Sequence, residues 1–283
     1  MSLSVFLAVL AAAFLHASWN ALIRSGTAGG SRLQNLLVLA LVQGALGVAL
    51  LCFAPLPPLQ IWPWLIAAGA LHAGYKLCLS AAYDHGDLSR VYPIARGTAP
   101  LLTLLLTVAL GIDALKSGPV LAILVLVAGI LTMAASALRA GESRRLIPWA
   151  LATATMTAAY TLVDGIGVRQ AGDLWMFLGW TFALDGLFFG LATLALQGPG
   201  IFRISRSGWS RGAMAGAASL GSYGVAVWAM TKAPIAMVGA LRETSILFAM
   251  LMGWLIFHEP MSRDKALAGG LILLGVVLMQ VLA

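Results

Sequence analysis

The chain has 283 residues, of which 61% are hydrophobic and only 10% are charged, and its mean hydropathy is +0.95. A soluble domain of this length carries roughly 25% charged residues, so the composition excludes a water-soluble globule and predicts a polytopic membrane protein. The formal net charge of +7 does not indicate a nucleic-acid partner, because the basic residues are spread over short loops between apolar runs.

Membrane-spanning helices are expected wherever ~20 mostly apolar residues follow one another. Ten segments meet this requirement: 3–23, 33–53, 62–82, 92–111, 119–138, 147–165, 174–196, 210–230, 234–257 and 266–282. The loops between them are short, and the N-terminus lacks the basic region of a cleavable signal peptide. Cys52 and Cys78 both fall inside apolar runs, which argues against a disulfide framework.

The loop charges predict the orientation of the bundle. Loops on one side carry eleven basic residues, namely Arg24, Arg32, Arg90, Arg139, Arg144, Arg145, Arg203, Arg206, Arg211, Arg263 and Lys265. The opposite loops carry only Lys116, Arg169 and Lys232. The positive-inside rule places the eleven in the cytoplasm and therefore both termini in the periplasm.

An internal repeat relates the two halves of the chain. Adding 146 to the numbers of Arg96, Thr98, Asp113 and Gly129 gives Arg242, Thr244, Glu259 and Gly275, which preserves residue type or charge each time. We therefore divide the chain into two five-helix repeats, 1–140 and 141–283. Because five is odd, the second repeat must insert upside down, an arrangement typical of secondary transporters with a site at the repeat interface.

Polar residues inside the predicted spans form the candidate substrate site around a central cavity. A charged residue at that depth costs at least ~2.5–3.5 kcal/mol, so such residues face protein or water. Helical spacing puts three side chains on one face of the first span and three on one face of the third. The candidates are His16, Trp19, Asn20, His72, Tyr75, Lys76, Arg96, Tyr160, Tyr223, Arg242 and Glu243.

Their arrangement suits a small solute, since the cations would hold a carboxylate and the aromatic rings would pack against its body. Internal roles are the alternative. Arg96 or Arg242 would then pair with Glu243 or Asp185 and lock helices together, the histidines would bond neighbouring helices, and Asp113 and Glu259 would cap helix ends.

Three stretches resemble the EamA branch of the drug/metabolite transporter superfamily. They are HASWNALIR in the first span, GDLSRVYPIARGTAPLL entering the fourth, and GALRETSILFAMLMGWLIFHEPMSRDKALAGGLILLGVVL near the end. The resemblance implies a ten-helix basket of inverted repeats that exports amino acids, related metabolites or drugs across the bacterial inner membrane. Members are often drawn with cytoplasmic termini, the reverse of what the Lys/Arg count predicts here.

These observations favour a secondary transporter that exports amino acids by alternating access and needs no cofactor. No GxxxxGK[ST] loop is present for ATP-driven pumping, and the buried acids and histidines leave coupling to protons open. The alternatives are an exporter of drugs or other organic metabolites, an intramembrane enzyme and a scaffold. An enzyme is disfavoured because HExxH and DDxxD are absent. The expected partners are a small solute and membrane lipid, and ten helices are enough to work as a monomer.

Overall fold

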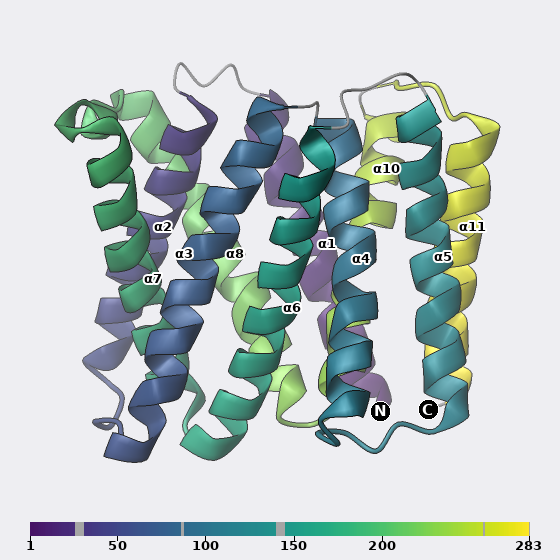
Figure 1. Cartoon of the computed structure of the whole chain (residues 1–283), viewed down its shortest axis with the longest axis horizontal. Coiled ribbons are helices and arrows are strands. Elements are labelled where there is room, and N and C mark those ends of the chain that lie inside the picture. The colour runs from purple at the N-terminus through teal and green to yellow at the C-terminus, as the bar shows by residue number, and fades with distance from the viewer. Residues whose placement is uncertain (26–30, 86–87, 140–144, 257, 283) are drawn as a thin grey trace.

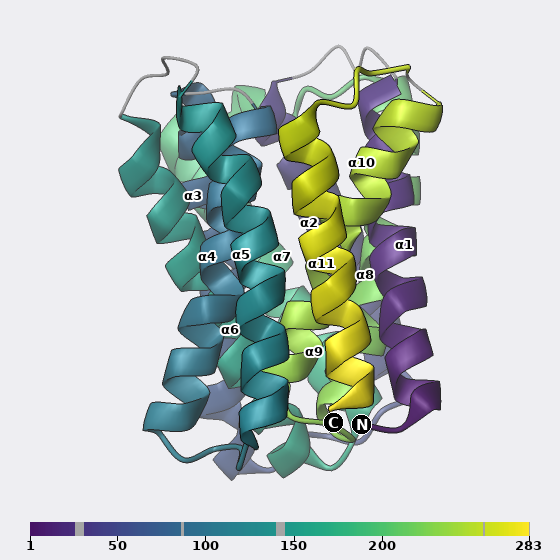
Figure 2. The same ribbon diagram turned by 90° about the vertical axis from the view of Figure 1, so that its right-hand side faces the viewer.

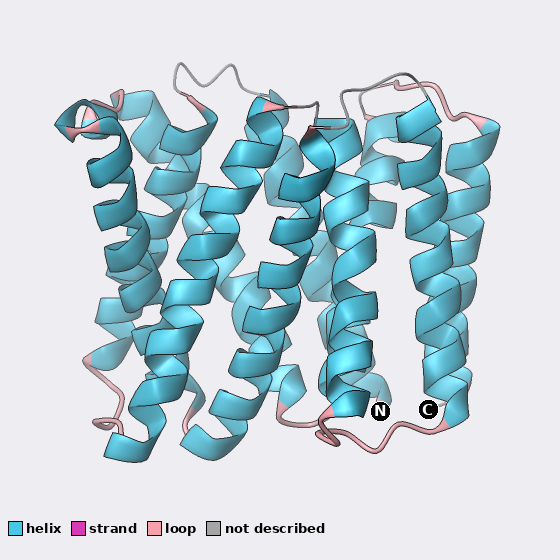
Figure 3. Cartoon of the chain, in the orientation of Figure 1, coloured by secondary structure: helices cyan, strands magenta, loops and turns pink. Residues whose placement is uncertain are grey.

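The computed structural model describes residues 1–25, 31–85, 88–139, 145–256 and 258–282, except for the side chains of 19–25, 88–93, 134 and 136–139. Helices make up nearly all of these residues, and no strand occurs among them (Figure 3). Each of the ten predicted spans corresponds to a helical region. The first five are α1 (Leu3–Ser25), α2 (Arg32–Leu51), α3 (Trp62–Asp84), α4 (Leu88–Ala109) and α5 (Ser117–Arg139).

The second set begins with α6 (Leu146–Ala171), α7 (Leu174–Gln197) and α8 (Arg206–Met230), and continues with α9 (Ile235–Arg242), α10 (Ser245–Leu255) and α11 (Arg263–Val281). Short 3-10 turns, η1 (Leu59–Ile61) and η2 (Pro199–Phe202), precede α3 and α8. Helix α6 is longer than predicted because it ends only at Gly172, which adopts the left-handed conformation (φ 71°) that closes a helix C-terminus.

The length and apolar composition of the helices identify this bundle as a multi-pass membrane protein. Within the described residues seven helical regions are long and apolar enough to cross a bilayer, α9 and α10 together forming one of them. Three further apolar stretches, Leu3–Ser18, Ile94–Ala109 and Ser117–Met133, are shorter. Large leucines on the outer helix faces, such as Leu105, Leu191 and Leu274, are about half exposed, as expected for side chains that face lipid.

The ninth predicted span is a broken helix rather than a continuous one. Between α9 and α10, the N–H groups of Glu243 and Thr244 donate to the carbonyls of Ala240 and Leu241, at 3.0 and 3.2 Å, with the tighter three-residue spacing. The Thr244 hydroxyl also donates to the Leu241 carbonyl at 2.6 Å, where it competes for the acceptor that Ser245 would use in a regular helix. Interrupted helices at membrane depth are found where the backbone lines protein or a cavity.

Helices from the two halves of the chain pack against each other throughout. At one edge of the bundle α2 packs along α7, and at the opposite edge α5 packs along α11 (Figures 1 and 2). Between these edges α3 packs on α6 and α7, α8 packs on α1 and α2, α4 packs on α6, and α1 packs on α9 and α10.

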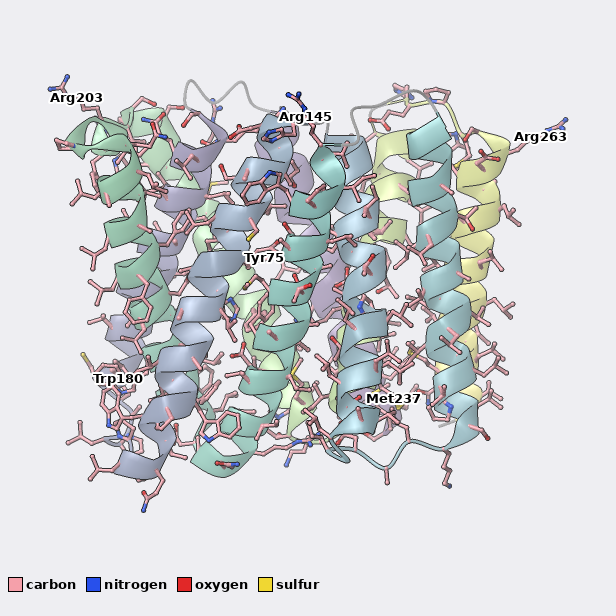
Figure 4. The ribbon with its side chains drawn as sticks, in the orientation of Figure 1. Tyr75, Arg145, Trp180, Arg203, Met237 and Arg263 are labelled. Carbon is pink, nitrogen blue, oxygen red and sulfur yellow. The ribbon has the colours of Figure 1, made fainter. Side chains whose placement is uncertain are left out.

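The two ends of the bundle differ in charge. Both chain termini lie at one end (Figure 1), which we call the terminal end. Arg145, Arg203 and Arg263 project from the other (Figure 4), which we call the arginine-rich end. The chain therefore crosses the bundle an even number of times between its termini, as the ten predicted spans require.

Candidate functional site

A pocket of about 360 Å³ lies inside the bundle and is lined by residues of eight helices, α1–α4 and α6–α9. Helix α2 contributes residues between Arg32 and Gln43, and α3 contributes residues between His72 and Tyr83. Since α2 begins and α3 ends at the arginine-rich end (Figure 1), the pocket extends from the middle of the bundle toward that end. Its volume is within the range typical of sites for small molecules.

A cluster of apolar and aromatic side chains fills the space between the pocket and the terminal end. Ile61, Leu65, Phe177 and Leu178 are buried there, and Trp62, Trp64, Leu174 and Trp180 pack against them. The rings of Trp62 and Trp180 meet edge to face, with centroids 4.7 Å apart. Helices α3 and α7 begin at the terminal end (Figure 1), so this cluster lies on the terminal side of the pocket.

One face of α3 forms a polar stripe along the pocket wall. His72, Tyr75 and Lys76, predicted from their spacing to share a helix face, all line the pocket, and Tyr83 continues the stripe toward the arginine-rich end. There the Arg32 guanidinium lies over the Tyr83 ring, 5.5 Å from its centroid, and donates to the Tyr83 carbonyl oxygen.

Behind His72 lies a buried carboxylate from the second half of the chain. The His72 Nε2–H group donates to Asp164 Oδ2 at 2.8 Å, and the Tyr223 hydroxyl donates to the same oxygen. The Tyr160 ring stacks on the imidazole, with centroids 4.2 Å apart. Asp164 is completely buried, and its other oxygen, Oδ1, has no hydrogen-bond partner among the described residues. The predicted candidates His72, Tyr160 and Tyr223 therefore form one connected group on α3, α6 and α8.

Lys76, one helical turn further along α3, is also bonded to a buried carboxylate of the second half of the chain. Its Nζ donates to Asp185 Oδ2 of α7 at 2.5 Å, and Asp185 is also completely buried. An ion pair removed from water in this way is costly unless both partners remain together. The pair therefore ties α3 to α7.

Among the described residues, Arg96 bonds to Glu243 and His16. Its Nη1 donates to both carboxylate oxygens of Glu243, at 3.2 and 3.1 Å, and its Nη2 donates to His16 Nε2 at 2.7 Å. Since a guanidinium can only donate, this imidazole nitrogen accepts and His16 carries its proton on Nδ1. This ion pair between Arg96 and Glu243 is one of the internal pairings considered above as the alternative to solute binding. It joins α4 to the break between α9 and α10.

Arg242 is placed differently. Its guanidinium carbon lies 4.6 Å from the centroid of the Tyr223 ring, a favourable cation–π geometry. The side chain lines the pocket and is only partly buried. No carboxylate within the described part of the chain forms an ion pair with it.

The candidates outside α3 differ in how they relate to the pocket. His16, Arg96 and Arg242 line the pocket together with the α3 stripe, whereas Glu243 is buried behind Arg96 and is not part of the lining. The side chains of Trp19 and Asn20 lie outside the described part of the structure. Several lining residues were not among the candidates: Arg32, Asn35, Gln43, Tyr83, Ser219 and Ser222.

Only Gln43 carried a signal that the sequence could have revealed. It is an isolated amide in an apolar span, it is 3% exposed, and its Nε2 donates to Ser219 Oγ at 3.2 Å. Within the residues that the structure describes, no group of three or more His, Cys, Asp or Glu side chains could hold a metal ion.

The turn residues that the sequence pairs across the repeat also have defined places. Asp113 accepts the Ile235 N–H at 2.6 Å with Oδ2, which caps the start of α9, and accepts from Arg169 at 3.0 Å with Oδ1. Arg169 in turn donates to the carbonyls of Met230 and Ala233. Glu259 lies 3.6 Å from the Lys265 ammonium group. Asp113 therefore has the helix-capping role expected of an acidic residue at a helix end, since it caps α9.

Comparison with known proteins indicates a membrane transporter of the drug/metabolite type. Residues 144–281 match the EamA-like transporter family. This match covers just under half of the chain. No curated protein matches the sequence. Among solved structures, one titled "Crystal structure of protein" is 20% identical, with a TM-score of 0.75 over 99% of this chain and 98% of that chain, and it supports the same overall fold.

Proposed function

We propose that the protein is a secondary transporter that exports small metabolites, amino acids first among them, across the bacterial inner membrane by alternating access. The observation that carries this proposal is the pocket halfway along the bundle, which brings ionisable side chains of both halves together. Ionisable residues at that depth in a membrane protein typically mark a solute pathway.

The helix contacts support the proposed division into inverted repeats, 1–140 and 141–283. If α1–α5 are exchanged with α6, α7, α8, the α9–α10 pair and α11, each of the helix contacts described under the overall fold becomes a contact that is also present. The packing of α3 on α6 becomes that of α8 on α1, and the packing of α4 on α6 becomes that of α9 and α10 on α1. The α2–α7 and α5–α11 contacts map onto themselves, as expected for helices beside a two-fold axis.

Individual residues at the α5–α11 contact follow the same exchange. A Cβ at Gly129 would lie 2.9 Å from Cγ1 of Ile272, and a Cβ at Gly275 would lie 2.7 Å from Cβ of Leu126. Gly275 is 146 positions after Gly129, and Ile272 is 146 positions after Leu126. Each repeat therefore places the same glycine against the same apolar position of the other repeat.

Alternating access requires a pocket that reaches one side of the membrane while the other side is closed. The pocket extends toward the arginine-rich end, which the positive-inside rule assigns to the cytoplasm. The aromatic cluster around Trp62 and Trp180 and the Asp113–Arg169 contact both lie on the terminal side. In this proposal the structure corresponds to the state that loads a solute from the cytoplasm.

The rival functions make different demands on the same pocket. An exporter of cationic drugs would need acidic groups on the wall, an intramembrane enzyme would change its solute chemically, and a scaffold would move none. Purified protein in proteoliposomes, loaded with an unlabelled compound and offered its labelled form outside, should accumulate label if the compound is a substrate. A panel of amino acids, organic acids, drugs and nucleosides, with the recovered label identified chemically, tests all of these possibilities. Absence of exchange for every compound would refute the transporter proposal.

A further inference from the structure

The wall of the pocket has one sign of charge. Four cationic side chains line it, namely Arg32, Lys76, Arg96 and Arg242, and no Asp or Glu of the described residues does. The three carboxylates nearest to the site, Asp164, Asp185 and Glu243, are buried behind the lining and bond to residues on the wall. A solute in the pocket therefore meets cations directly, whereas the carboxylates lie behind the lining residues that bond to them.

The four cations are not equally available to a solute. Lys76 is neutralised by Asp185, and Arg96 is neutralised by Glu243. Arg32 is exposed at the arginine-rich end. Arg242 alone combines a place in the middle of the bundle with the absence of a carboxylate partner among the described residues.

The proposed repeat explains why Arg242 has no carboxylate partner in the described part of the chain. In the first half the sequence reads Arg96-Gly97-Thr98, and in the second half it reads Arg242-Glu243-Thr244. Arg96 bonds to Glu243 of the opposite repeat. The residue that corresponds to Glu243 is Gly97, which has no side chain, so the matching partner for Arg242 does not exist.

Stacking on Tyr223 leaves the donors of Arg242 available. A ring beneath the guanidinium interacts with its face, whereas the N–H groups lie in its plane and point outward. In a partly buried site such a fork favours a bidentate carboxylate, with two parallel charge-assisted hydrogen bonds. Much of the remaining lining is apolar, including Leu36, Leu39, Leu79 and Phe182, and can pack against the body of a solute.

We propose that Arg242 binds the carboxylate of the solute, and that the pocket accepts carboxylate-bearing solutes while it rejects solutes whose only charge is positive. This inference rests on the proposed transport function and narrows its substrate class. Amino acids with apolar side chains and simple organic acids fit the pocket. Amines and cationic drugs do not, because the wall offers them no carboxylate.

Equilibrium binding to the purified wild-type protein in detergent tests the selectivity. The probes are three matched sets with methyl, isobutyl and benzyl side chains, each set containing an organic acid, the corresponding amino acid and the corresponding amine. We expect at least one acid or amino acid to bind, and its amine to bind at least tenfold more weakly. Equal or tighter binding of the amine, or no binding of any carboxylate probe up to its solubility limit, would overturn the inference.

Variants then test the role of Arg242. Loss of charge-assisted hydrogen bonds predicts that Arg242→Gln weakens carboxylate binding about 10- to 100-fold. Arg242→Lys, which keeps the charge but not the fork, should lie between Arg242→Gln and wild type. The matched control is Arg263→Gln, which removes the same charge from an exposed site outside the pocket and should bind like wild type.

Two outcomes separate this inference from the proposed function. Arg242-dependent carboxylate binding without any flux in proteoliposomes would overturn transport and leave the site in place. Flux that prefers amines, or carboxylate binding that is unchanged in both Arg242 variants, would overturn the site. If Arg242→Gln does not fold, the probe selectivity of the wild-type protein and the Arg242→Lys variant still decide the question.

Discussion

Replacing Gly275 by alanine tests the contact between α5 and α11. A Cβ at this position would lie 2.7 Å from the backbone nitrogen of Leu126 and 2.8 Å from its Cα. Backbone atoms cannot turn aside as a flexible side chain can, so the two helices must separate. Overpacking of this kind typically costs about 1–3 kcal/mol.

Gly270 is the matched control because it lies on the same helix, and a Cβ there would have no neighbour within 4 Å. Any gain in helix propensity on replacing glycine by alanine, about 0.5–1 kcal/mol, is shared by both variants and cancels in their comparison. We therefore expect Gly275→Ala to be about 1–3 kcal/mol less stable than Gly270→Ala.

The measurement is unfolding in detergent followed by tryptophan fluorescence. The proposed repeat adds that Gly129→Ala should show a loss of similar size, because its Cβ would lie 2.9 Å from the Ala268 carbonyl oxygen and the Ile272 nitrogen. The double variant should lose less than the sum of the two single losses, since separation of the helices by one substitution makes room for the other. If Gly275→Ala is as stable as Gly270→Ala, the close packing of α5 on α11 described above is wrong.

Three further substitutions address the polar contacts. Glu243→Gln leaves the Arg96 guanidinium buried without the Glu243 carboxylate and should reduce the free energy of unfolding by about 3–5 kcal/mol. Adding Arg96→Met to the same chain should recover most of this loss. Wild-type stability of the Glu243→Gln variant would contradict the pairing. Asp113→Ala removes the cap of α9 and should cost about 0.5–2 kcal/mol, whereas Asp113→Asn retains an acceptor and should lose less; equal losses would mean that the cap contributes little. Asp164→Asn weakens the hydrogen bonds that Asp164 accepts from His72 and from the Tyr223 hydroxyl. The substitution should lower the free energy of unfolding by about 1.5–3 kcal/mol, measured by thermal unfolding. An unchanged melting point would show that these bonds do not hold α3 to α6.

Some polar contacts were readable from the sequence and others were not. The face of α3 that carries His72, Tyr75 and Lys76 follows from helical geometry, and all three line the pocket. The partners of these residues come from α6 and α7, about ninety to one hundred and ten positions away. Spacing along one helix cannot indicate which carboxylate on another helix will meet it.

The break in the ninth span was also beyond sequence reasoning. The segment around Arg242 is apolar and long enough to span a membrane, so hydropathy predicts a continuous helix. The interruption consists of local hydrogen bonds of Glu243 and Thr244, and the ion pair between Glu243 and Arg96 lies beside it. These are contacts of a particular packing, and hydropathy is insensitive to them.

The sequence alone determined that this chain is a helical membrane protein with ten apolar segments, since the length and hydrophobicity of each segment are local properties. It also indicated a second half that repeats the first, because the register of Arg96 and Gly129 recurs 146 positions later. Only the tertiary structure decided which of the two matched arginines is neutralised. Arg96 reaches Glu243 across the bundle and Arg242 meets an aromatic ring instead, because the energy of a buried charge depends on the side chains that surround it in space and not on its neighbours along the chain.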